Sequence, residues 1–371
     1  MEFTAKKSDL LRELDLAQGV VEKKTTIPIL SNLLLEAANG SVRLSATDLE
    51  LGILSSCPAK VKKEGSGTVP ARRLVEIVRS LPEADVRIKV LENHWVHLTC
   101  ERSSFKLVGM ARDNFPALPS VPASLASLPG ATLATLIKRT AFAVSSEESR
   151  YTLNGALLVL KPETVMMVAT DGHRLAMVEH TVTVGGISNE LRILVPRKAM
   201  TELERLLGQS ASDAQVEVSK DESHLFFSVG DRILISRLLT GQFPNYEAVL
   251  PKETPRLAEI DRAAFTAAVR RVALLSDERS HAIRLRLDKG QLELFSTSGE
   301  YGEAQEAMDA VYSQEAMEIG FNHQYILDFL NVLGEGGNIR LELQDEQSAG
   351  QLRPLDDADY RYRYVVMPMR I

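Results

Sequence analysis

The chain is poor in cysteine and in aromatic residues. Cys57 and Cys100 are its only two cysteines among 371 residues, and neither belongs to a Cys-x-x-Cys or Cys/His ligand pattern. This excludes a disulfide-rich scaffold, gives no support to a zinc site, and fits a reducing compartment. Aromatic residues make up 5% of the chain, with Trp95 as the single tryptophan. The interleaved stacking side chains typical of single-strand nucleic-acid binders are therefore missing.

Long apolar runs are missing too. No segment approaches the roughly 20 apolar residues of a membrane span. The N-terminal "MEFTAKKSDLL" lacks the apolar stretch and the small-residue cleavage site of a signal peptide. Without either segment, the protein is expected in the cytoplasm. A content of 44% hydrophobic and 25% charged residues predicts a soluble protein of two or three domains. The formal net charge of -7 argues against a uniformly basic surface.

One pattern occurs three times along the chain. Thr170 in "MVATDGHRLAMVEH" aligns with Thr47 in "LSATDLELGIL" and with Thr297 in "LFSTSGEYGEA", at separations of 123 and 127 residues. Helical patterns before and after each frame keep nearly the same period. The sequence therefore predicts three copies of one domain. Boundaries are expected where Pro, Ser and Gly collect, which gives domains 1–122, 123–252 and 253–371.

Each copy combines helical and strand periodicity. Leu10, Leu14 and Ala17 recur at helical spacing, and the segment around Val42 and Leu44 alternates as a strand does. Equivalent segments in the other copies predict two helices and about eight short strands per copy. The fold class is therefore α+β, with three repeated domains built of two helices and antiparallel sheets.

Positive charge concentrates in the predicted helices. The six windows 6–24, 71–80, 132–146, 197–207, 262–275 and 323–333 hold 16 Lys or Arg and 8 Asp or Glu, so the rest of the chain carries a net charge of -15. For any one helix, such charges are usually a solvated face. Five of the six windows are individually positive, which favours one basic surface that meets a duplex phosphate backbone without reading bases.

The chain resembles the beta subunit of bacterial DNA polymerase III, the replicative sliding clamp. The resemblance covers the whole chain and rests on the threefold repeat, "IPILSNLLLEA" at 27–37, "VATDGHRLA" at 168–176, "TGQFPNYEAVLPK" at 240–252 and "YVVMPMRI" at 364–371. It implies a head-to-tail homodimer whose six domains close a ring around double-stranded DNA, with helices lining the hole. It also implies a non-catalytic processivity factor without cofactor or metal.

The resemblance implies a pocket between the second and third domains. Short hydrophobic peptides of the polymerase III catalytic subunit, the clamp loader, other polymerases and repair proteins would insert there. The residues matching the family motifs are Leu153, Thr170, Gly172, His173, Arg174, Leu175, Pro244, Val249, Val365, Val366, Met367, Pro368, Met369 and Arg370. The two methionines would form adaptable apolar walls, while backbone and Arg groups would fix the polar end of the peptide. Ala248 replaces a basic residue of some relatives, and residues 345–363, including Ser348, match poorly.

The same resemblance implies DNA contacts and a dimer interface. The expected DNA contacts are Lys24, Arg72, Arg73, Arg150, Tyr151, Arg197 and Lys198. At the interface, Phe105 and Leu107 would meet Leu274 and Leu275 of the partner copy, with Arg102 and Lys106 against Glu300, Glu303 and Glu306. The alternatives are an ordinary solubilising role for each cation and a strand core for Phe105 and Leu107.

Other signals support weaker alternatives. Asp171 and His173 could form an acid/base pair of a hydrolase with Arg174, but no nucleophile motif or phosphate loop accompanies them. A DNA-binding module that grips duplex in an open groove is the second alternative. His94 and His97 in "HWVH" are expected on opposite faces of a strand, which disfavours a shared metal. "QLELF" at 291–295 resembles the peptide that clamps bind, yet its alternation predicts a strand.

Overall fold

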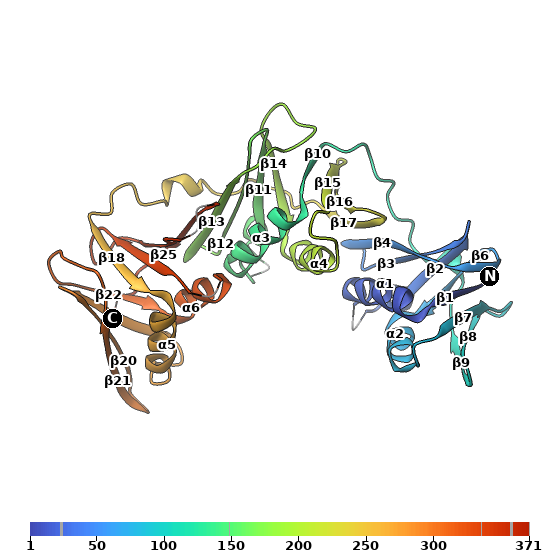
Figure 1. The fold of residues 1–371 in the computed structure, drawn as a ribbon, viewed down its shortest axis with the longest axis horizontal. Coiled ribbons are helices and arrows are strands. Elements are labelled where there is room, and N and C mark those ends of the chain that lie inside the picture. Colours follow the sequence, from blue (N-terminus) through green and yellow to red (C-terminus); the bar gives the residue numbers. More distant parts are fainter. Residues whose placement is uncertain (23–24, 148, 335, 357–358, 371) are drawn as a thin grey trace. The chain divides into compact units, whose positions relative to one another are not determined.

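The computed structural model describes residues 1–22, 25–147, 149–334, 336–356 and 359–370. Within them the chain forms six α-helices and 25 β-strands (Figure 1). It divides into two compact units: unit 1 holds Met1–Ala134 and Lys198–Leu238, and unit 2 holds Thr135–Arg197 and Leu239–Ile371. The second sequence copy is thus shared between the two units. Among the described helices, none is both long enough and apolar enough to cross a membrane.

Unit 1 contains two antiparallel sheets. Their strand orders are β5-β1-β7-β8-β9 and β10-β15-β16-β17-β4-β3-β2-β6. The strands are β1 (Glu2–Lys6), β2 (Asn32–Ala38), β3 (Ser41–Thr47), β4 (Leu51–Pro58), β5 (Lys60–Lys63), β6 (Gly65–Pro70), β7 (Asp85–Val90), β8 (Trp95–Cys100), β9 (Ser103–Val108), β10 (Ala126–Pro129), β15 (Gln215–Lys220), β16 (His224–Val229) and β17 (Arg232–Arg237). The helices are α1 (Lys7–Val20), α2 (Ala71–Ser80) and, from its second residue, α4 (Arg197–Gly208).

Strands of the first and second copies pair inside unit 1. β17 lies antiparallel to β4, with Leu234 opposite Ile53, and both side chains are buried. The eight-stranded sheet is therefore continuous across two sequence copies.

A close approach explains the glycine in the last turn of helix α1. A Cβ at Gly19 would lie 1.8 Å from Nη1 of Arg205 and 2.1 Å from Oε2 of Glu202. Arg205 and Glu202 form an ion pair at 2.8 Å, and Arg205 also donates to the carbonyl of Asp15. The missing side chain thus makes room for an ion pair of α4 against the backbone of α1.

Unit 2 also contains two antiparallel sheets, of eight and four strands. Their orders are β14-β11-β12-β13-β25-β24-β23-β18 and β21-β20-β19-β22. The strands are β11 (Gly155–Lys161), β12 (Thr164–Thr170), β13 (Arg174–Thr181), β14 (Leu191–Pro196), β18 (Arg256–Asp261), β19 (Ala282–Asp288), β20 (Gln291–Ser298), β21 (Gly302–Asp309), β22 (Met317–Asn322), β23 (Asn338–Leu343), β24 (Gly350–Pro354) and β25 (Tyr360–Val366). Helices α5 (Arg262–Ala273) and α6 (His323–Val332) lie in this unit, and α3 (Gly130–Thr140) crosses the boundary.

The helices lie where the sequence predicts them. All six begin within two residues of the predicted windows, but α1 and α3 end earlier, at Val20 and Thr140. The hydroxyl of Thr140 donates to the carbonyl of Leu136 at 2.7 Å, and the φ of Thr140, -125°, has left the helical region. A short 3-10 helix, η3 (Ala141–Ala143), then replaces the expected last turn of α3.

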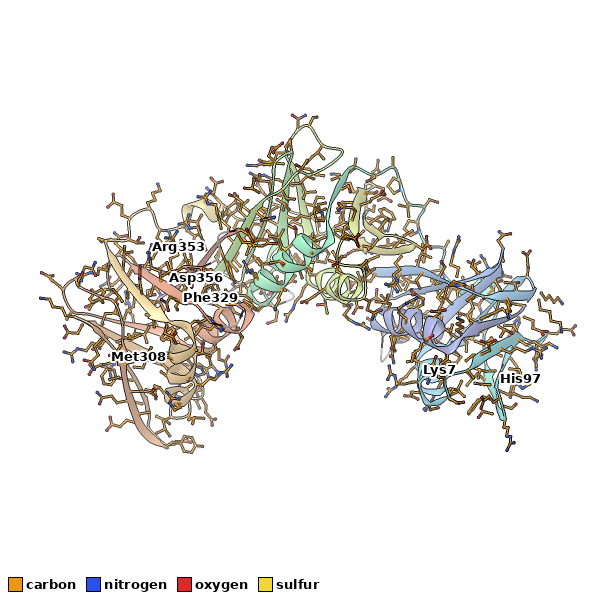
Figure 2. The ribbon with its side chains drawn as sticks, viewed as in Figure 1. Lys7, His97, Met308, Phe329, Arg353 and Asp356 are labelled. Carbon is orange, nitrogen blue, oxygen red and sulfur yellow. The ribbon has the colours of Figure 1, made fainter. Side chains whose placement is uncertain are left out.

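Two further expectations have clear outcomes. "QLELF" is strand β20, with Leu292 and Leu294 buried, so the predicted strand is confirmed and occupation of the chain's own pocket is excluded. The placement of both histidines of "HWVH" in one strand is wrong. His94 lies in the turn before β8 with φ +63°, while His97 lies in β8 and contacts the hydroxyl of Ser104 (Figure 2).

Candidate functional site

The Thr-Asp frame of the second copy forms the tight turn between β12 and β13. Oδ1 of Asp171 accepts hydrogen bonds from the N–H groups of His173 (2.9 Å) and Arg174 (3.0 Å). The hydroxyl of Thr170 donates to the carbonyl of Arg174 and accepts from the N–H of Gly172. Gly172 has φ +90°, a conformation that favours glycine. The conspicuous polar residues therefore build a turn.

The first copy builds the same turn, which explains why the frame repeats. Oδ1 of Asp48 accepts from the N–H groups of Glu50 and Leu51, and the hydroxyl of Thr47 donates to the carbonyl of Leu51. Leu49 takes the place of Gly172, with φ +77°. Asp171 carries the added contact from Nε of Arg174 at 3.0 Å. Its carboxylate is thus held by the turn, and the hydrolase alternative loses its general base.

The turn lies against the C-terminal end of the chain. β13 pairs with β25, which places Arg174 opposite Val366 and Leu175 opposite Val365. The N–H of Met367 then donates to the carbonyl of His173 at 2.9 Å. Beyond it, the N–H of Met369 donates to the carbonyl of Gly320 in β22. Two motifs almost 200 residues apart in the chain therefore lie side by side at one end of the paired strands β13 and β25.

A cluster of apolar side chains lies beside this turn on one face of the eight-stranded sheet. We call this cluster the floor. Its buried members are Leu157, Val159, Met166, Val168, Leu175, Leu194, Tyr246 and Val365. The segment 239–250 covers part of the floor through the half-buried Leu239, Phe243 and Leu250. Two of the predicted pocket residues, Leu175 and Val365, are therefore buried members of the floor.

The other predicted pocket residues surround the floor in different ways. Met367 is 38% exposed at the edge, and Val249 and Pro244 are exposed on the covering segment. Leu153 is half-buried in the 3-10 helix η4 (Tyr151–Leu153), next to Arg150, whose Nη1 donates to the carbonyl of Asp171. Of the remainder, Gly172, His173 and Arg370 are exposed, Pro368 and Met369 are half-buried, and Thr170 is buried.

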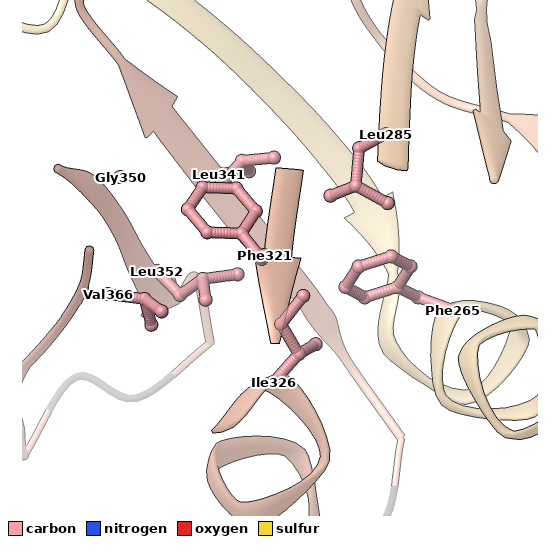
Figure 3. A pocket seen from close by; sticks show the side chains of 8 residues that line it. All are labelled: Phe265, Leu285, Phe321, Ile326, Leu341, Gly350, Leu352 and Val366. Atoms are coloured by element: carbon pink, nitrogen blue, oxygen red, sulfur yellow. The ribbon is translucent and has the colours of Figure 1, made fainter. Parts of the chain in front are cut away.

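Two predicted wall residues point to the opposite face of the sheet, because successive side chains of a strand alternate. Val366 lines the apolar pocket of Figure 3, together with Phe265, Leu285, Phe321, Ile326, Leu341, Gly350 and Leu352. This space has no room for a water molecule, so it is a packing gap of the core. We call the side with the floor the outer face and the side of Figure 3 the inner face.

Arg174 is the other exception. Its Nη1 contacts Oδ2 of Asp328 in α6 at 2.6 Å, its Nη2 donates to the carbonyl of Phe142 at 2.7 Å, and its guanidinium lies 4.3 Å from the centre of the Tyr325 ring. Burial opposes the charge, but the neighbouring Tyr364 side chain and the hydrogen bond to Asp328 keep the pKa of Arg174 above its usual range. This guanidinium therefore has an internal role, which joins the turn to α6, and its contact with a peptide stays a prediction.

Residues 345–348 form a turn of their own next to the floor. Asp345 accepts from the N–H groups of Gln347 and Ser348 and from the Ser348 hydroxyl at 2.9 Å. These hydrogen bonds lower the pKa of the Asp345 carboxyl. Ala349 follows directly and packs against the floor. Ser348 is thus engaged with Asp345.

The predicted DNA-contacting cations have carboxylate neighbours. Arg72 and Arg73 share Glu76, at 3.0 and 2.9 Å, and Arg150 pairs with Glu147 at 2.8 Å. Lys24 lies outside the described residues, Tyr151 is 71% exposed, and Arg197 is exposed at the start of α4.

Lys198 is the most heavily paired of these cations. Its ammonium group lies 3.2 Å from Asp48 and 3.1 Å from Glu50, with Glu22 at 3.7 Å. Burial alone would lower the pKa of Lys198, but Asp48 and Glu50 raise it. Its charge is compensated inside unit 1, so Arg72, Arg73 and Tyr151 are better placed to meet a backbone phosphate or sugar.

The predicted dimer residues lie at sheet edges and at a helix end. Phe105 and Leu107 are half-buried on β9, the last strand of the five-stranded sheet, beside the exposed Arg102 and Lys106. In unit 2, Leu274 is 78% exposed at the end of α5, with Leu275 half-buried next to it.

The acidic residues of this predicted interface divide into two groups. Glu303 is exposed on β21, an edge strand of the four-stranded sheet, and Glu300 is exposed in the turn before it. Glu306 instead forms a two-point ion pair with Arg271 of α5 in its own chain. That ion pair lowers the pKa of Glu306. Because Glu306 is already paired with Arg271, Glu303 is better placed than Glu306 to meet a cation of another copy.

Several side chains that shape the site are not among the predicted ones. Tyr246 and Met166 belong to the floor, and Asp328, Phe142 and Tyr325 surround Arg174. One signal was available for the floor. "GALLVLK" and "TVMMVAT" are continuous apolar runs, which are typical of strands covered on both faces. In the part of the chain that the structure describes, no group of three or more His, Cys, Asp or Glu side chains could hold a metal ion.

Comparison with known proteins decides the family. Family models match the N-terminal, central and C-terminal domains of the DNA polymerase III beta subunit at residues 1–119, 127–245 and 247–370. The chain belongs to the DNA polymerase III beta subunit family. It is thus a sliding clamp, a non-catalytic processivity factor of DNA replication.

Individual relatives agree along the whole chain. The beta sliding clamps of Pseudomonas putida and Escherichia coli K12 are 38% and 37% identical to it, with 100% of both chains covered. A crystal structure of the DNA polymerase III subunit beta from Pseudomonas aeruginosa matches with a TM-score of 0.92 and 37% identity over 100% of both chains. A second structure of that clamp, bound to griselimycin, matches with a TM-score of 0.93 and the same identity and coverage.

Proposed function

We propose that two copies of this clamp associate head to tail and close a ring around double-stranded DNA in the cytoplasm. The ring would hold the polymerase III catalytic subunit, the clamp loader, other polymerases and repair proteins through one shared pocket. Its repeated domains would be 1–122, 123–252 and 253–371. The pairing of β13 with β25 carries the pocket part of this proposal, because it places the exposed Met367 and the buried floor beside one another.

Sheet edges of opposite charge favour head-to-tail closure. β9 and β21 are edge strands of their sheets. An edge strand offers unpaired N–H and C=O groups to another chain. β9 is flanked by Arg102 and carries Lys106, while β21 carries Glu303. Attraction between unlike edges, with repulsion between like ones, selects the head-to-tail arrangement. The exposed Leu274 supplies apolar area for the same contact.

Helix-borne cations would attract the duplex without fixing its sequence. Arg72 and Arg73 are exposed on α2, and they bring two positive charges against the single carboxylate of Glu76. Contacts of this kind neutralise backbone phosphates, weaken with salt and carry no base information. A ring lined in this way keeps the DNA inside while letting it slide.

Retention on DNA tests the ring directly. After loading onto nicked circular DNA by a competent clamp loader with ATP, we expect the protein to stay bound through gel filtration. Cutting the circle at one site should then release nearly all of it, because a ring slides off free ends. Retention on the linear product with unblocked ends would instead support the open-groove alternative. Blocking both ends with bound protein should restore retention.

Truncation of Met367 tests the pocket. We expect Met367→Ala to weaken binding of a fluorescein-labelled "QLELF" peptide roughly tenfold, since this exposed side chain beside the floor would be an apolar anchor. Fluorescence anisotropy gives the affinity, and griselimycin should displace the peptide from the wild-type protein. Val311→Ala is the matched control, because Val311 is 72% exposed in the same unit but is not part of the site. Equal losses in the two variants would contradict the pocket.

A further inference from the structure

A hydrogen-bonded chain of polar side chains continues the outer face beyond the floor. We call it the outer-face network; its members are Glu342, Gln351, Arg353 and Arg363. Strand alternation places all four on the side of Val365, opposite the inner face where Phe329 stacks on Tyr364. Glu342 and Gln351 are buried, so the network is part of the packed structure.

The network has a fixed direction. Oε1 of Gln351 accepts from Nε of Arg363 at 2.6 Å, and Nε2 of Gln351 donates to Glu342. Nη2 of Arg353 forms an ion pair with Oε1 of Glu342 at 2.7 Å. Buried polar side chains that are bonded in series, as Arg363, Gln351 and Glu342 are, hold one another in one arrangement. The guanidinium of Arg363 is therefore fixed at the end that lies toward the floor.

Arg363 extends this order to the segment that covers the floor. Its Nη2 donates to the carbonyl of Pro251 at 3.2 Å. Pro251 directly follows Leu250, which packs against the floor. Within the described parts of the chain, no other hydrogen bond joins residues 250–255 to the sheet. Arg363 is thus the polar tether where the covering segment leaves the floor.

We propose that Arg363 is a positioning residue of the peptide pocket: through Pro251 it sets how closely the covering segment 239–250 lies over the floor. This inference rests on the proposed peptide-binding function. A pocket wall that is already in place spares a bound peptide the cost of ordering it. The divergent residues 345–363 would then contribute to the pocket through its support, without touching the peptide.

The test compares Arg363→Ala and Arg363→Lys in the full-length protein, with the labelled "QLELF" peptide as the probe. We expect Arg363→Ala to weaken binding roughly tenfold, chiefly through faster dissociation, because the loosened wall closes less firmly over the bound peptide. Arg363→Lys retains one donor and should recover part of the loss. Hydrogen exchange of the peptides that contain residues 239–250 should increase in Arg363→Ala at a temperature where the protein stays folded.

Arg353→Ala is the matched control, since Arg353 belongs to the same network through Glu342 but does not contact segment 250–255. It should lower thermal stability but weaken peptide binding much less than Arg363→Ala does, because Arg363 keeps its own bonds to Gln351 and Pro251. An equal loss of affinity in Arg353→Ala would overturn the inference, because the effect would then follow general stability. Unchanged affinity in Arg363→Ala would also overturn it while leaving the proposed function intact. Failure of the wild-type protein to bind the peptide or griselimycin would overturn both.

Discussion

Arg174→Ala should lower the free energy of unfolding of unit 2 by about 3 kcal/mol, the lower end of the range for breaking a buried ion pair. The side chain of Arg174 is 10% exposed, and its removal leaves Asp171, Asp328 and the carbonyl of Phe142 without their shared donor. Asp328 is 40% exposed and can be rehydrated, which keeps the loss from being larger. For a unit of this size, the melting temperature should fall by roughly 6–12 °C.

Urea unfolding followed by circular dichroism measures this loss, and hydrogen exchange locates it. Exchange should rise in the peptides covering the turn and α6 and stay unchanged around the equivalent turn at Asp48 in unit 1. Arg361→Ala is the control, because Arg361 is 84% exposed in the adjacent strand and pairs with Glu179 at 3.1 Å. An exposed pair of this kind contributes roughly 0–1 kcal/mol. Similar losses of unfolding free energy in both variants would show that the buried contacts of Arg174 contribute no more than an exposed ion pair.

Local patterns in the sequence predict much of the fold. The helices, the threefold repeat and the strand at residues 291–295 follow from hydrophobic periodicity, which each segment carries in itself. The Thr-Asp frame was also readable as a turn, since Asp and Thr side chains bind the backbone N–H groups that follow them. Its repetition in Thr47 and Asp48 is explained by that turn chemistry.

Strand partners and side-chain faces were beyond local reasoning. Nothing within β17 or β13 indicates that each pairs with a strand of another sequence copy. Because the side-chain period of a strand is two, one step in register separates Leu175 on the floor from Arg174 on the inner face. The resemblance to clamps assigned both residues to the same pocket, and only the structure shows that their side chains lie on opposite faces of the sheet.

Charge compensation was equally hidden from the sequence. Lys198 pairs with Asp48 and Glu50, which lie about 150 residues away in the chain. The sequence counted Lys198 as a basic helix residue, although these two carboxylates compensate its charge. Arg72 and Arg73 lie near Glu76 in the sequence, and their pairing could have been anticipated from helical spacing. Contacts at i+3 and i+4 are visible in a sequence, whereas contacts made by the fold are not.

Arg232→Ala should destabilise unit 1 by roughly 3–5 kcal/mol, because it leaves a buried carboxylate with less compensation. The side chain of Glu13 in α1 is 2% exposed and receives two hydrogen bonds from Arg232 in β17, at 3.0 and 2.6 Å. Arg12 also contacts Glu13 at 3.2 Å, but its side chain is 51% exposed and so compensates less. This pair joins the first sequence copy to the second inside one unit.

A double-mutant cycle separates the value of the pair from the cost of an unpaired charge. We expect Glu13→Leu with Arg232→Met to recover most of the stability lost in Arg232→Ala, because replacing both buried charges with apolar groups removes their desolvation as well as their attraction. Urea unfolding of Glu13→Leu, Arg232→Met and the double variant, each compared with the wild-type protein, gives the coupling energy. If the double variant is as unstable as Arg232→Ala, the packing of these side chains between α1 and β17 contributes more to stability than their charges do. Recovery would mean that the ion pair specifies which strand α1 packs against more than it strengthens the sheet.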